Sequence, residues 1–266
     1  MSIWVIGGTS ESARVVRAIA PLQIPCIITV TTDNAKSLYP PETNLLKIWV
    51  GKLDPQQLSD FLEQHKIKVI LDASHPFAVE ISKLAIATSQ QYNIPYLRFE
   101  RPVVGQNSIP PSFEVNSDII FLDNLETLLS GDYLTGKRVL LTLGYRTLPL
   151  FQPWQNKAQL LTRILPSPIA LETALNSGFT PDRIIAIRPP ISEALETALW
   201  QQWNISLVVT KSSGTAGGED IKIKVAQNLG IPLIILERPA INYPQKTDNL
   251  EEVIHCCQKY NSRLNR

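Results

Sequence analysis

The chain has 266 residues, of which 44% are hydrophobic and 18% charged, and its formal net charge is +1 at pH 7. This length allows one large domain or two medium ones, and the near-neutral charge argues against nucleic acid or a membrane surface as a partner. The three cysteines and three histidines lack metal-ligand spacing, and no apolar run is long enough to span a membrane. Because the N-terminus enters an apolar strand without a signal-peptide pattern, we expect a cytosolic protein without a metal.

The first hundred residues alternate between short apolar runs and amphipathic segments. The pattern predicts strands over 3–7, 25–31, 45–50, 67–73 and 95–99, and helices over 10–20, 54–65 and 75–93. Asp54 and Pro55 are typical of a helix N-cap and a first helical position. Strands this apolar are buried on both faces, so the sequence predicts a parallel sheet with helices on each side.

The second half repeats this alternation after a less regular stretch. Residues 100–136, which include Pro102, Pro110 and Pro111, are predicted to carry a strand or two and a helix near 123–130. Further strands are predicted near 137–143, 159–165, 183–187, 206–210 and 232–236, and helices near 168–177, 191–202, 219–229 and 248–260. The second half therefore predicts another sheet flanked by helices.

Two stretches of the chain end in nearly the same sequence. The segment that begins at Ile94 and ends in Glu-Arg-Pro is repeated from Ile231, and the same offset carries Gly7 onto Gly144. This offset far exceeds the roughly 20 to 50 residues of a solenoid repeat. We therefore expect an α/β protein of two tandem Rossmann-like domains, 1–134 (with 100–134 as the connecting region) and 135–266. The active-site cleft is expected between them, and a monomer suffices to form it.

The loop after the first strand has the composition of a nucleotide-binding turn. Gly7 and Gly8 let backbone amides approach an anion, and the start of the following helix favours negative charge. The full G-x-G-x-x-G pattern is absent, and the alternative is that Thr9 or Ser10 only caps the helix. The place of this loop after the first strand favours the nucleotide interpretation.

The second strand ends in residues that bear on the choice of cofactor. Thr31, Thr32 and Lys36 suit the 2′-phosphate of NADP, whereas Asp33 suits the ribose hydroxyl of NAD. The sequence leaves this choice open.

The fourth apolar run ends in a dense polar cluster. Ligands in this fold class bind at the carboxyl ends of strands, so Ser74 and His75 are expected to face the nicotinamide end of a dinucleotide. The alternative is that Asp72 caps the loop and His75 caps the next helix.

Cations follow several strands of the second half, at Arg146, Arg163, Arg188 and Lys211. Converging cations suit a ligand with several carboxylates, bound by charge-assisted hydrogen bonds. The alternative is that each is a solvated surface charge. The glycine-rich loop that follows Lys211 could hold a phosphate, but a P-loop has its lysine after the glycines.

Three motifs make the chain similar to a known family. Ile-Gly-Gly-Thr-Ser-Glu at 6–11, Asp-Ala-Ser-His-Pro-Phe-Ala at 72–78 and Lys-Ser-Ser-Gly-x-x-Gly-Gly at 211–218 have the order and spacing of the precorrin-6A reductases of corrin biosynthesis. The resemblance covers the chain to about Pro239 and implies a two-domain Rossmann-like reductase. It implies hydride transfer from NADPH, or from NADH in some members, to precorrin-6A or cobalt-precorrin-6A, which gives precorrin-6B or its cobalt form.

The strand ends and the resemblance together assign the candidate residues. The cofactor-binding candidates are Gly7, Gly8, Thr9, Ser10, Glu11, Thr31, Thr32, Lys36, Ser74 and Pro76. The substrate-binding candidates are Tyr145, Arg146, Arg163, Ser213, Gly214, Gly217, Gly218 and Lys222. Reduction of a conjugated ring also needs a proton, which either water or a side chain could supply. The candidate side chains are His75 and Lys211, with Asp72 orienting one of them.

Two other functions fit parts of the sequence. A short-chain reductase or epimerase needs a Tyr-x-x-x-Lys pair after its central strands, and we expect no such pair at Tyr92, Tyr96 or Tyr133. A non-catalytic NADP-sensing module would keep the glycine loop without the cations of the second half. A bound tetrapyrrole would distinguish a reductase from both.

Overall fold

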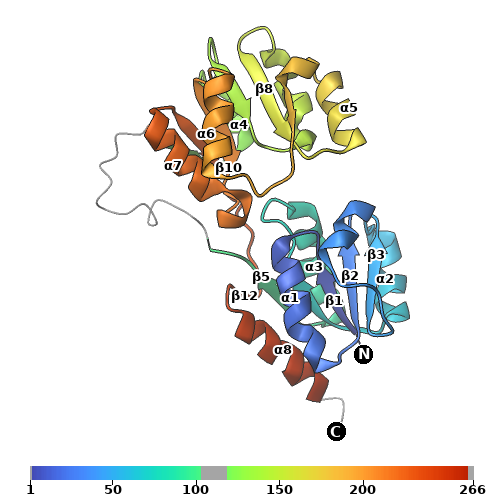
Figure 1. Ribbon diagram of the computed structural model, residues 1–266. Helices are drawn as coiled ribbons and strands as arrows, with labels where there is room; N and C mark the ends of the chain where they lie inside the picture. The colour runs from blue at the N-terminus through green and yellow to red at the C-terminus, as the bar shows by residue number, and fades with distance from the viewer. Residues whose placement is uncertain (1, 103–118, 263–266) are drawn as a thin grey trace. The chain divides into compact units, whose positions relative to one another are not determined.

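The structure is a computed structural model that describes residues 2–102 and 119–262 (Figure 1). The chain divides into two compact units, each with its own sheet and core. Unit 1 consists of Met1–Pro102 and Ala240–Arg266, and unit 2 consists of Val103–Pro239.

Unit 1 is built on a parallel sheet that is six-stranded in the described residues. Its strands are β1 (Ser2–Ile6), β2 (Cys26–Val30), β3 (Leu46–Val50), β4 (Ile67–Asp72), β5 (Tyr96–Phe99) and β12 (Lys246–Thr247), in the spatial order β12-β5-β4-β1-β2-β3. Helices α1 (Ser10–Ile19) and α8 (Leu250–Ser262) cover one face, and α2 (Pro55–Gln64) and α3 (Val79–Tyr92) cover the other. Short 3₁₀ segments η1 (Ala20–Leu22) and η2 (Asp33–Leu38) follow α1 and β2.

Strand β1 shows why this sheet is covered on both faces. Its side chains are all buried and point alternately to the two sides. Val5 packs in the cluster with Val16 of α1 and Val253 of α8, whereas Trp4 packs edge-on against Phe61 of α2, with ring centres 5.4 Å apart. Full burial of each such side chain contributes about 1.5–3 kcal/mol, so an apolar strand is stable only between two helical layers.

Unit 2 has a second parallel sheet, also six-stranded in the described residues. Its strands are β6 (Ile119–Leu122), β7 (Arg138–Leu141), β8 (Gln159–Ile164), β9 (Ile184–Ala186), β10 (Leu207–Lys211) and β11 (Leu233–Leu236), in the order β6-β11-β10-β7-β8-β9. One face packs against α4 (Leu125–Ser130), η4 (Tyr145–Trp154) and α5 (Pro168–Asn176), and the other against α6 (Glu193–Gln202) and α7 (Glu219–Leu229). The short segments η5 (Pro181–Arg183) and η6 (Thr215–Gly217) precede β9 and α7.

The two sheets have the same strand order, with β12 and β6 as equivalent edge strands. β6 follows β5 in the chain but pairs with β11, and β12 follows β11 but pairs with β5. The chain thus leaves each sheet to add an edge strand to the other sheet: β6 comes after β5, and β12 comes after β11. Both crossings begin at the repeated Glu-Arg-Pro, at 100–102 and 237–239.

This exchange corrects the predicted domain boundary between 134 and 135. The predicted connecting region contains β6 and α4, which belong to unit 2, and the predicted C-terminal domain contains β12 and α8, which belong to unit 1. Consecutive elements are usually neighbours in space, which is why chain order suggested two contiguous domains. An edge strand can instead pair with any sheet whose outermost strand has unpaired backbone groups, whether or not that sheet is its neighbour in the chain.

The predicted fold class is confirmed, because both halves form parallel sheets with helices on both faces. No helix in the part of the chain that the structure describes has the length and hydropathy of a membrane span. The cleft that we expect between the domains stays a prediction.

Candidate active site

The predicted site residues lie in the loops at the carboxyl ends of the parallel strands or in the strand ends and first helical turns that border these loops, where ligands bind in this class of fold. In unit 1 these loops follow β1, β2 and β4, and in unit 2 they follow β7, β8 and β10. Each unit therefore has its own set of candidate loops.

The loop after β1 is held by a helix cap. The Thr9 side chain accepts a hydrogen bond from the Ser12 amide (3.0 Å), and the Ser12 hydroxyl accepts one from the Thr9 amide (3.1 Å). The Thr9 hydroxyl also donates to the carbonyl oxygen of Ala73 over 2.7 Å. The capping role that the sequence left open for Thr9 is therefore confirmed, and the same residue joins the β1 loop to the β4 loop.

The two glycines of this loop are needed for different reasons. A Cβ on Gly7 would lie 2.3 Å from the hydroxyl of Tyr39 and 2.9 Å from Cγ2 of Ile28. Gly8 has a φ of +95°, a backbone conformation that residues with a side chain rarely adopt. A Cβ at this position would nevertheless meet nothing within 4 Å. The space above Gly8 is therefore open, and an anion can approach the N-terminus of α1 beside the exposed Ser10.

Glu11 is buried at the start of α1. Its carboxylate forms an ion pair with Arg101, with 2.6 Å between Oε2 and Nη1, and accepts a hydrogen bond from the Ser10 hydroxyl (3.1 Å). Burial would raise the pKa of Glu11, but the hydrogen bond and charge of Arg101 outweigh it and hold the pKa below its ordinary value. These contacts give Glu11 a role in supporting the loop, and its predicted contact with a cofactor stays a prediction.

The residues after β2 are exposed. Thr31 and Thr32 lead into η2, in which Nζ of Lys36 lies 3.0 Å from Oδ1 of Asp33. The two side chains that favoured different cofactors therefore neutralise each other here. An exposed pair of this kind contributes about 0–1 kcal/mol, so a phosphate group can compete for Lys36.

Asp72 ends β4 and is completely buried. Its Oδ1 accepts hydrogen bonds from the Ser74 amide (3.0 Å) and from Nη1 of Arg98 (2.8 Å), and its Oδ2 accepts from the hydroxyls of Ser82 and Tyr96 (both 2.7 Å). Burial would raise the pKa of Asp72, but the charge of Arg98 and these hydrogen bonds hold it below its ordinary value. Asp72 thus caps the start of the loop, as the alternative from the sequence held, and its role in orienting a proton donor stays a prediction.

Arg98 completes this buried network. Its Nη1 also donates to the Ser74 hydroxyl (3.0 Å), and its Nη2 donates to Glu100 (3.1 Å), which in turn pairs with Lys246 of β12 (2.7 Å). The guanidinium group lies 5.2 Å from the ring centre of Tyr243. The network therefore joins the β4 loop to the segment that returns to unit 1.

His75 lies half-buried in the β4 loop, next to the buried Pro76. Its Nδ1 accepts a hydrogen bond from the Phe77 amide (3.2 Å), so the neutral ring carries its proton on Nε2. The N-cap of α3 is Ala78, and the alternative that His75 caps this helix is therefore wrong. The imidazole can donate a hydrogen bond to a ligand from Nε2.

In unit 2, Lys211 at the end of β10 lies within electrostatic reach of Arg146 in η4. Burial lowers the pKa of Lys211, and the positive charge of Arg146 lowers it further. Arg146 is exposed and its guanidinium lies 5.8 Å from the ring centre of Tyr145. A lysine with a lowered pKa releases its proton more readily near neutral pH.

The other predicted cations of unit 2 differ from one another. Arg163 of β8 forms an ion pair with the buried Glu196 of α6, which also accepts a hydrogen bond from Nε1 of Trp200 (3.0 Å). Arg188 is exposed after β9. The predicted group of four similar cations is thus corrected, because the charge of Arg163 is already neutralised within unit 2.

Two buried charged side chains support the glycine-rich loop after β10. Glu219 accepts a hydrogen bond from the Gly214 amide (2.6 Å), and Nζ of Lys222 donates to the carbonyl oxygens of Gly217 (2.9 Å) and Gly218 (3.0 Å). Burial lowers the pKa of Lys222 to about 8 and raises the pKa of Glu219. Lys222 therefore holds the loop through two of its carbonyl groups, and its predicted contact with substrate stays a prediction.

The glycines of this loop are required by geometry. A Cβ on Gly217 would lie 1.9 Å from Oγ of Ser213, and Gly214 and Gly218 both have a φ of +68°. Ser213 is itself buried beneath Gly217. The loop can take this tight form only with glycine at these positions.

Several residues of the site were missed by the sequence analysis. Arg98 could have been found, because a charged side chain interrupts the otherwise apolar strand β5, and Glu100 directly follows that strand. Glu219, which directly follows two glycines, was a weaker signal. Tyr39 gave no local signal, since it contacts the loop of Gly8 from 31 positions away.

The expectation for Tyr133 is wrong, because Lys137 lies four residues after it and completes a Tyr-x-x-x-Lys spacing. Tyr133 packs against the core cluster of unit 2, and Lys137 directly precedes β7. The pair thus lies at the amino end of its strand, opposite to the candidate loops, and does not support a short-chain reductase.

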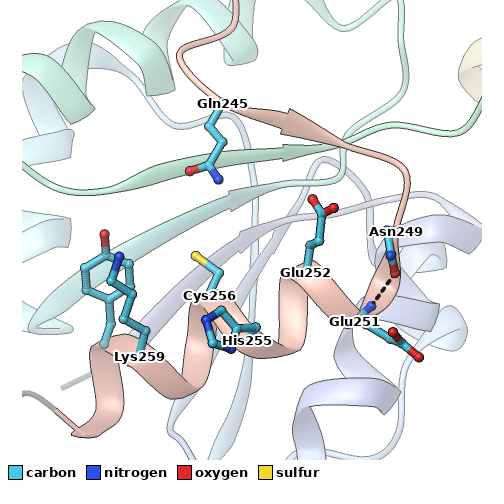
Figure 2. A pocket seen from close by; sticks show the side chains of 8 residues that line it. Gln245, Asn249, Glu251, Glu252, His255, Cys256 and Lys259 are labelled. Atoms are coloured by element: carbon cyan, nitrogen blue, oxygen red, sulfur yellow. Dashed lines mark hydrogen bonds between the residues drawn. The ribbon is translucent and has the colours of Figure 1, made fainter.

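A pocket of about 410 Å³ lies along α8, and none of the predicted site residues lines it. It is lined by Gln245, Asn249, Glu251, Glu252, His255, Cys256, Lys259 and Tyr260. Figure 2 shows Glu252 and Cys256 extending from α8 toward the segment that carries Gln245. Within 2–102 and 119–262, no three His, Cys, Asp or Glu side chains are arranged to hold a metal ion.

The residues of unit 1 fit a nicotinamide dinucleotide. Gly8 leaves open space at the N-terminus of α1, where a pyrophosphate is favoured. The exposed Thr31, Thr32 and Lys36 follow the neighbouring strand β2, where the adenosine ribose lies in this class of fold.

The chain matches one family model over residues 2–258, that of the precorrin-6x reductase CbiJ/CobK. It is 46% identical to a cobalt-precorrin-6A reductase of Synechocystis sp., over 97% of both chains. It is 31% identical to a cobalt-precorrin-6A reductase of Priestia megaterium, over 95% of this chain and 96% of that one. Among solved structures, it is similar to a CobK precorrin-6A reductase with a TM-score of 0.76 and 23% identity, over 98% of this chain and 97% of that one. The last likeness supports the fold.

Proposed function

The chain belongs to the precorrin-6x reductase family, and we propose that it transfers a hydride from NADPH to the macrocycle of cobalt-precorrin-6A. Membership of this family makes the protein an oxidoreductase of cobalamin biosynthesis with a nicotinamide cofactor and a tetrapyrrole substrate. The cobalt form of the substrate is favoured because the relatives that are 46% and 31% identical both carry that name.

Unit 1 is proposed to bind the cofactor. The open Gly8 loop suits the pyrophosphate, and Thr31, Thr32 and Lys36 suit the 2′-phosphate of NADPH. Lys36 would exchange its exposed partner Asp33 for the phosphate. Ser74 and His75 would line the nicotinamide end, and a bound nicotinamide cofactor supplies the hydride.

Unit 2 is proposed to bind the tetrapyrrole. The observation that carries this proposal is the cationic group of Lys211 and Arg146 beside the glycine-rich loop, since the substrate carries several carboxylate arms. Lys211 is also the better candidate for the proton donor, because burial has lowered its pKa. Nδ1 of His75 accepts a hydrogen bond from the Phe77 amide, so a proton from this ring would come from Nε2.

The proposal is tested by anaerobic absorbance at 340 nm with NADPH or NADH, and with precorrin-6A or cobalt-precorrin-6A. We expect NADPH oxidation coupled to a spectral shift of the cobalt macrocycle. Oxidation with the other cofactor or the metal-free macrocycle would correct that half of the proposal. A folded protein that binds NADPH but oxidises it with neither macrocycle would instead be an NADP-sensing module.

The proton donor is tested by single-turnover rates of His75→Ala and Lys211→Ala. We expect hydride transfer to slow by about 10²-fold or more in Lys211→Ala, as is typical for loss of a general acid, and less in His75→Ala. Wild-type rates in both variants would mean that neither side chain supplies the proton.

A further inference from the structure

We propose that Tyr39 is the positioning residue that holds the cofactor loops of unit 1 in their binding form before the cofactor arrives. The inference rests on the proposed function, because it assumes that the loops after β1, β2 and β4 bind a nicotinamide dinucleotide. Tyr39 is buried itself and acts through the backbone of these loops, without touching the ligand.

Tyr39 is wedged against the β1 loop. Its hydroxyl accepts a hydrogen bond from the Gly8 amide over 2.7 Å and lies 2.6 Å from Oγ of Ser12. It also occupies the place that a Cβ on Gly7 would take, at 2.3 Å. One phenol group therefore determines the position of two glycines and of the first turn of α1.

A donor and an acceptor can be assigned for each hydrogen bond between Tyr39, Ser12 and Thr9. The Ser12 hydroxyl donates to the carbonyl oxygen of Thr9 (2.7 Å), so its oxygen is left to accept the proton of Tyr39. Tyr39 in turn accepts from the Gly8 amide, and the Thr9 hydroxyl donates to the carbonyl oxygen of Ala73. Burial raises the pKa of Tyr39, so the phenol keeps its proton at neutral pH. Every hydroxyl in the chain of hydrogen bonds thus has one acceptor.

This chain of hydrogen bonds spans all three candidate loops of unit 1. Tyr39 ends η2, and its amide donates to the carbonyl oxygen of Lys36 over 3.0 Å. Its side chain reaches the β1 loop at Gly8, and that loop reaches the β4 loop through Thr9 and Ala73. The proposed contacts for the 2′-phosphate, the pyrophosphate and the nicotinamide are therefore fixed relative to one another through Tyr39.

A fixed arrangement raises affinity because binding no longer has to order the loops. Loss of the Tyr39 hydroxyl would leave the partly buried Gly8 amide and the buried Ser12 hydroxyl each without one hydrogen-bond partner. We expect the affinity for NADPH to fall about tenfold, which corresponds to about 1.4 kcal/mol. The rate at saturating NADPH should change little, because the reacting groups are untouched.

The test compares Tyr39→Phe with Tyr92→Phe, which removes a hydroxyl from an exposed tyrosine at the far end of α3. Calorimetry should show about tenfold weaker NADPH binding in Tyr39→Phe and unchanged binding in Tyr92→Phe. Amide hydrogen exchange of the ligand-free protein should be faster over residues 7–12 in Tyr39→Phe alone. Kinetics should show a raised KM for NADPH with kcat preserved.

Ser12→Ala provides a second variant that removes the acceptor of the Tyr39 proton. If Tyr39 acts through Ser12, the double variant should bind NADPH little more weakly than either single variant. Unchanged NADPH affinity and unchanged hydrogen exchange in both single variants would overturn the inference, as would a loss of kcat with affinity preserved. A wild-type protein that binds no nicotinamide cofactor would overturn the proposed function instead, so the wild type is measured first.

Discussion

Nη1 of Arg98 donates a hydrogen bond to Oδ1 of Asp72 over 2.8 Å, and both side chains are completely buried. The pair joins the carboxyl ends of β4 and β5 directly beneath the loop of Ser74 and His75. Two charges that are buried away from water need several hydrogen-bond partners. Here the hydroxyls of Ser82 and Tyr96, the Ser74 amide and the carboxylate of Glu100 provide them. The loop that carries the central sequence motif therefore rests on a buried ionic network.

Breaking this pair should destabilise unit 1 strongly. Arg98→Met removes the cation and leaves Asp72 charged and buried, for which we expect a loss of about 3–5 kcal/mol in the free energy of unfolding by urea. Lys52→Met is the control, because it breaks an exposed pair with Glu80 and should change stability by less than about 1 kcal/mol. Similar small losses in both variants would show that the buried network does not stabilise the fold.

The same network predicts how stability depends on acid. The pKa of Asp72 is lower in the folded chain than in the unfolded one, so its stabilisation is complete above the unfolded value and is lost as the pH falls through the folded value. We expect unfolding free energy to drop below about pH 4, near the ordinary pKa of an aspartate. Asp72→Asn should be less stable at neutral pH and should show a shallower drop, whereas the exposed Asp60→Asn should follow the wild type. An equally steep acid limb in Asp72→Asn would contradict this.

Two proposed functions of Lys211, attraction of the substrate by its positive charge and donation of a proton, can be tested separately. As an acid it must be protonated, so the rate of hydride transfer should fall as the pH rises through its lowered pKa. Lys211→Arg keeps the positive charge but cannot release a proton in this range. We expect it to bind the tetrapyrrole with a KM near that of the wild type while single turnover slows by about 10²-fold. A wild-type rate in Lys211→Arg would show that Lys211 contributes only its charge.

The glycine-rich loop of unit 2 should not tolerate a side chain at Gly217. The Cβ of Gly217→Ala would lie 1.9 Å from Oγ and 2.5 Å from Cβ of Ser213, so the loop must shift. We expect the KM for the tetrapyrrole to rise at least tenfold, because the shifted loop would misplace the groups that bind the substrate. A tenfold change corresponds to about 1.4 kcal/mol of binding free energy. Gly136→Ala is the matched control, because its φ of +71° imposes backbone strain but a Cβ there meets nothing within 4 Å. Equal KM values in the two variants would show that the loop does not bind the substrate.

Several features of the site could be predicted because they depend on short-range sequence. Strand ends and glycine turns are local patterns, which is why the loops at Gly8, Ser74 and Gly214 are recognisable from the sequence alone. Similarly, Asp54 was predicted as a helix cap, and its carboxylate accepts a hydrogen bond from the Gln56 amide over 2.6 Å. Capping needs only neighbouring residues, so the sequence suffices to predict it.

The roles of individual charged side chains were not predictable in the same way. Glu11 and Arg163 looked like ligand contacts, but each also forms an ion pair with a residue from another part of the fold. A charge at a strand end can face a ligand or a buried partner, and only the spatial neighbours decide between them. Tyr39 was missed for the same reason, since its contacts with Gly8 and Ser12 are distant in sequence.

By itself, the sequence determined two parallel sheets, their helical cover and the loops that carry the family motifs, because apolar periodicity and turn residues act locally. Only the tertiary structure decided that β6 and β12 are exchanged between the two sheets, because strand pairing joins edges that are distant in the chain. It also decided which charged residues support the loops and which remain exposed beside them, because burial and ion pairing depend on neighbours that the sequence order does not reveal.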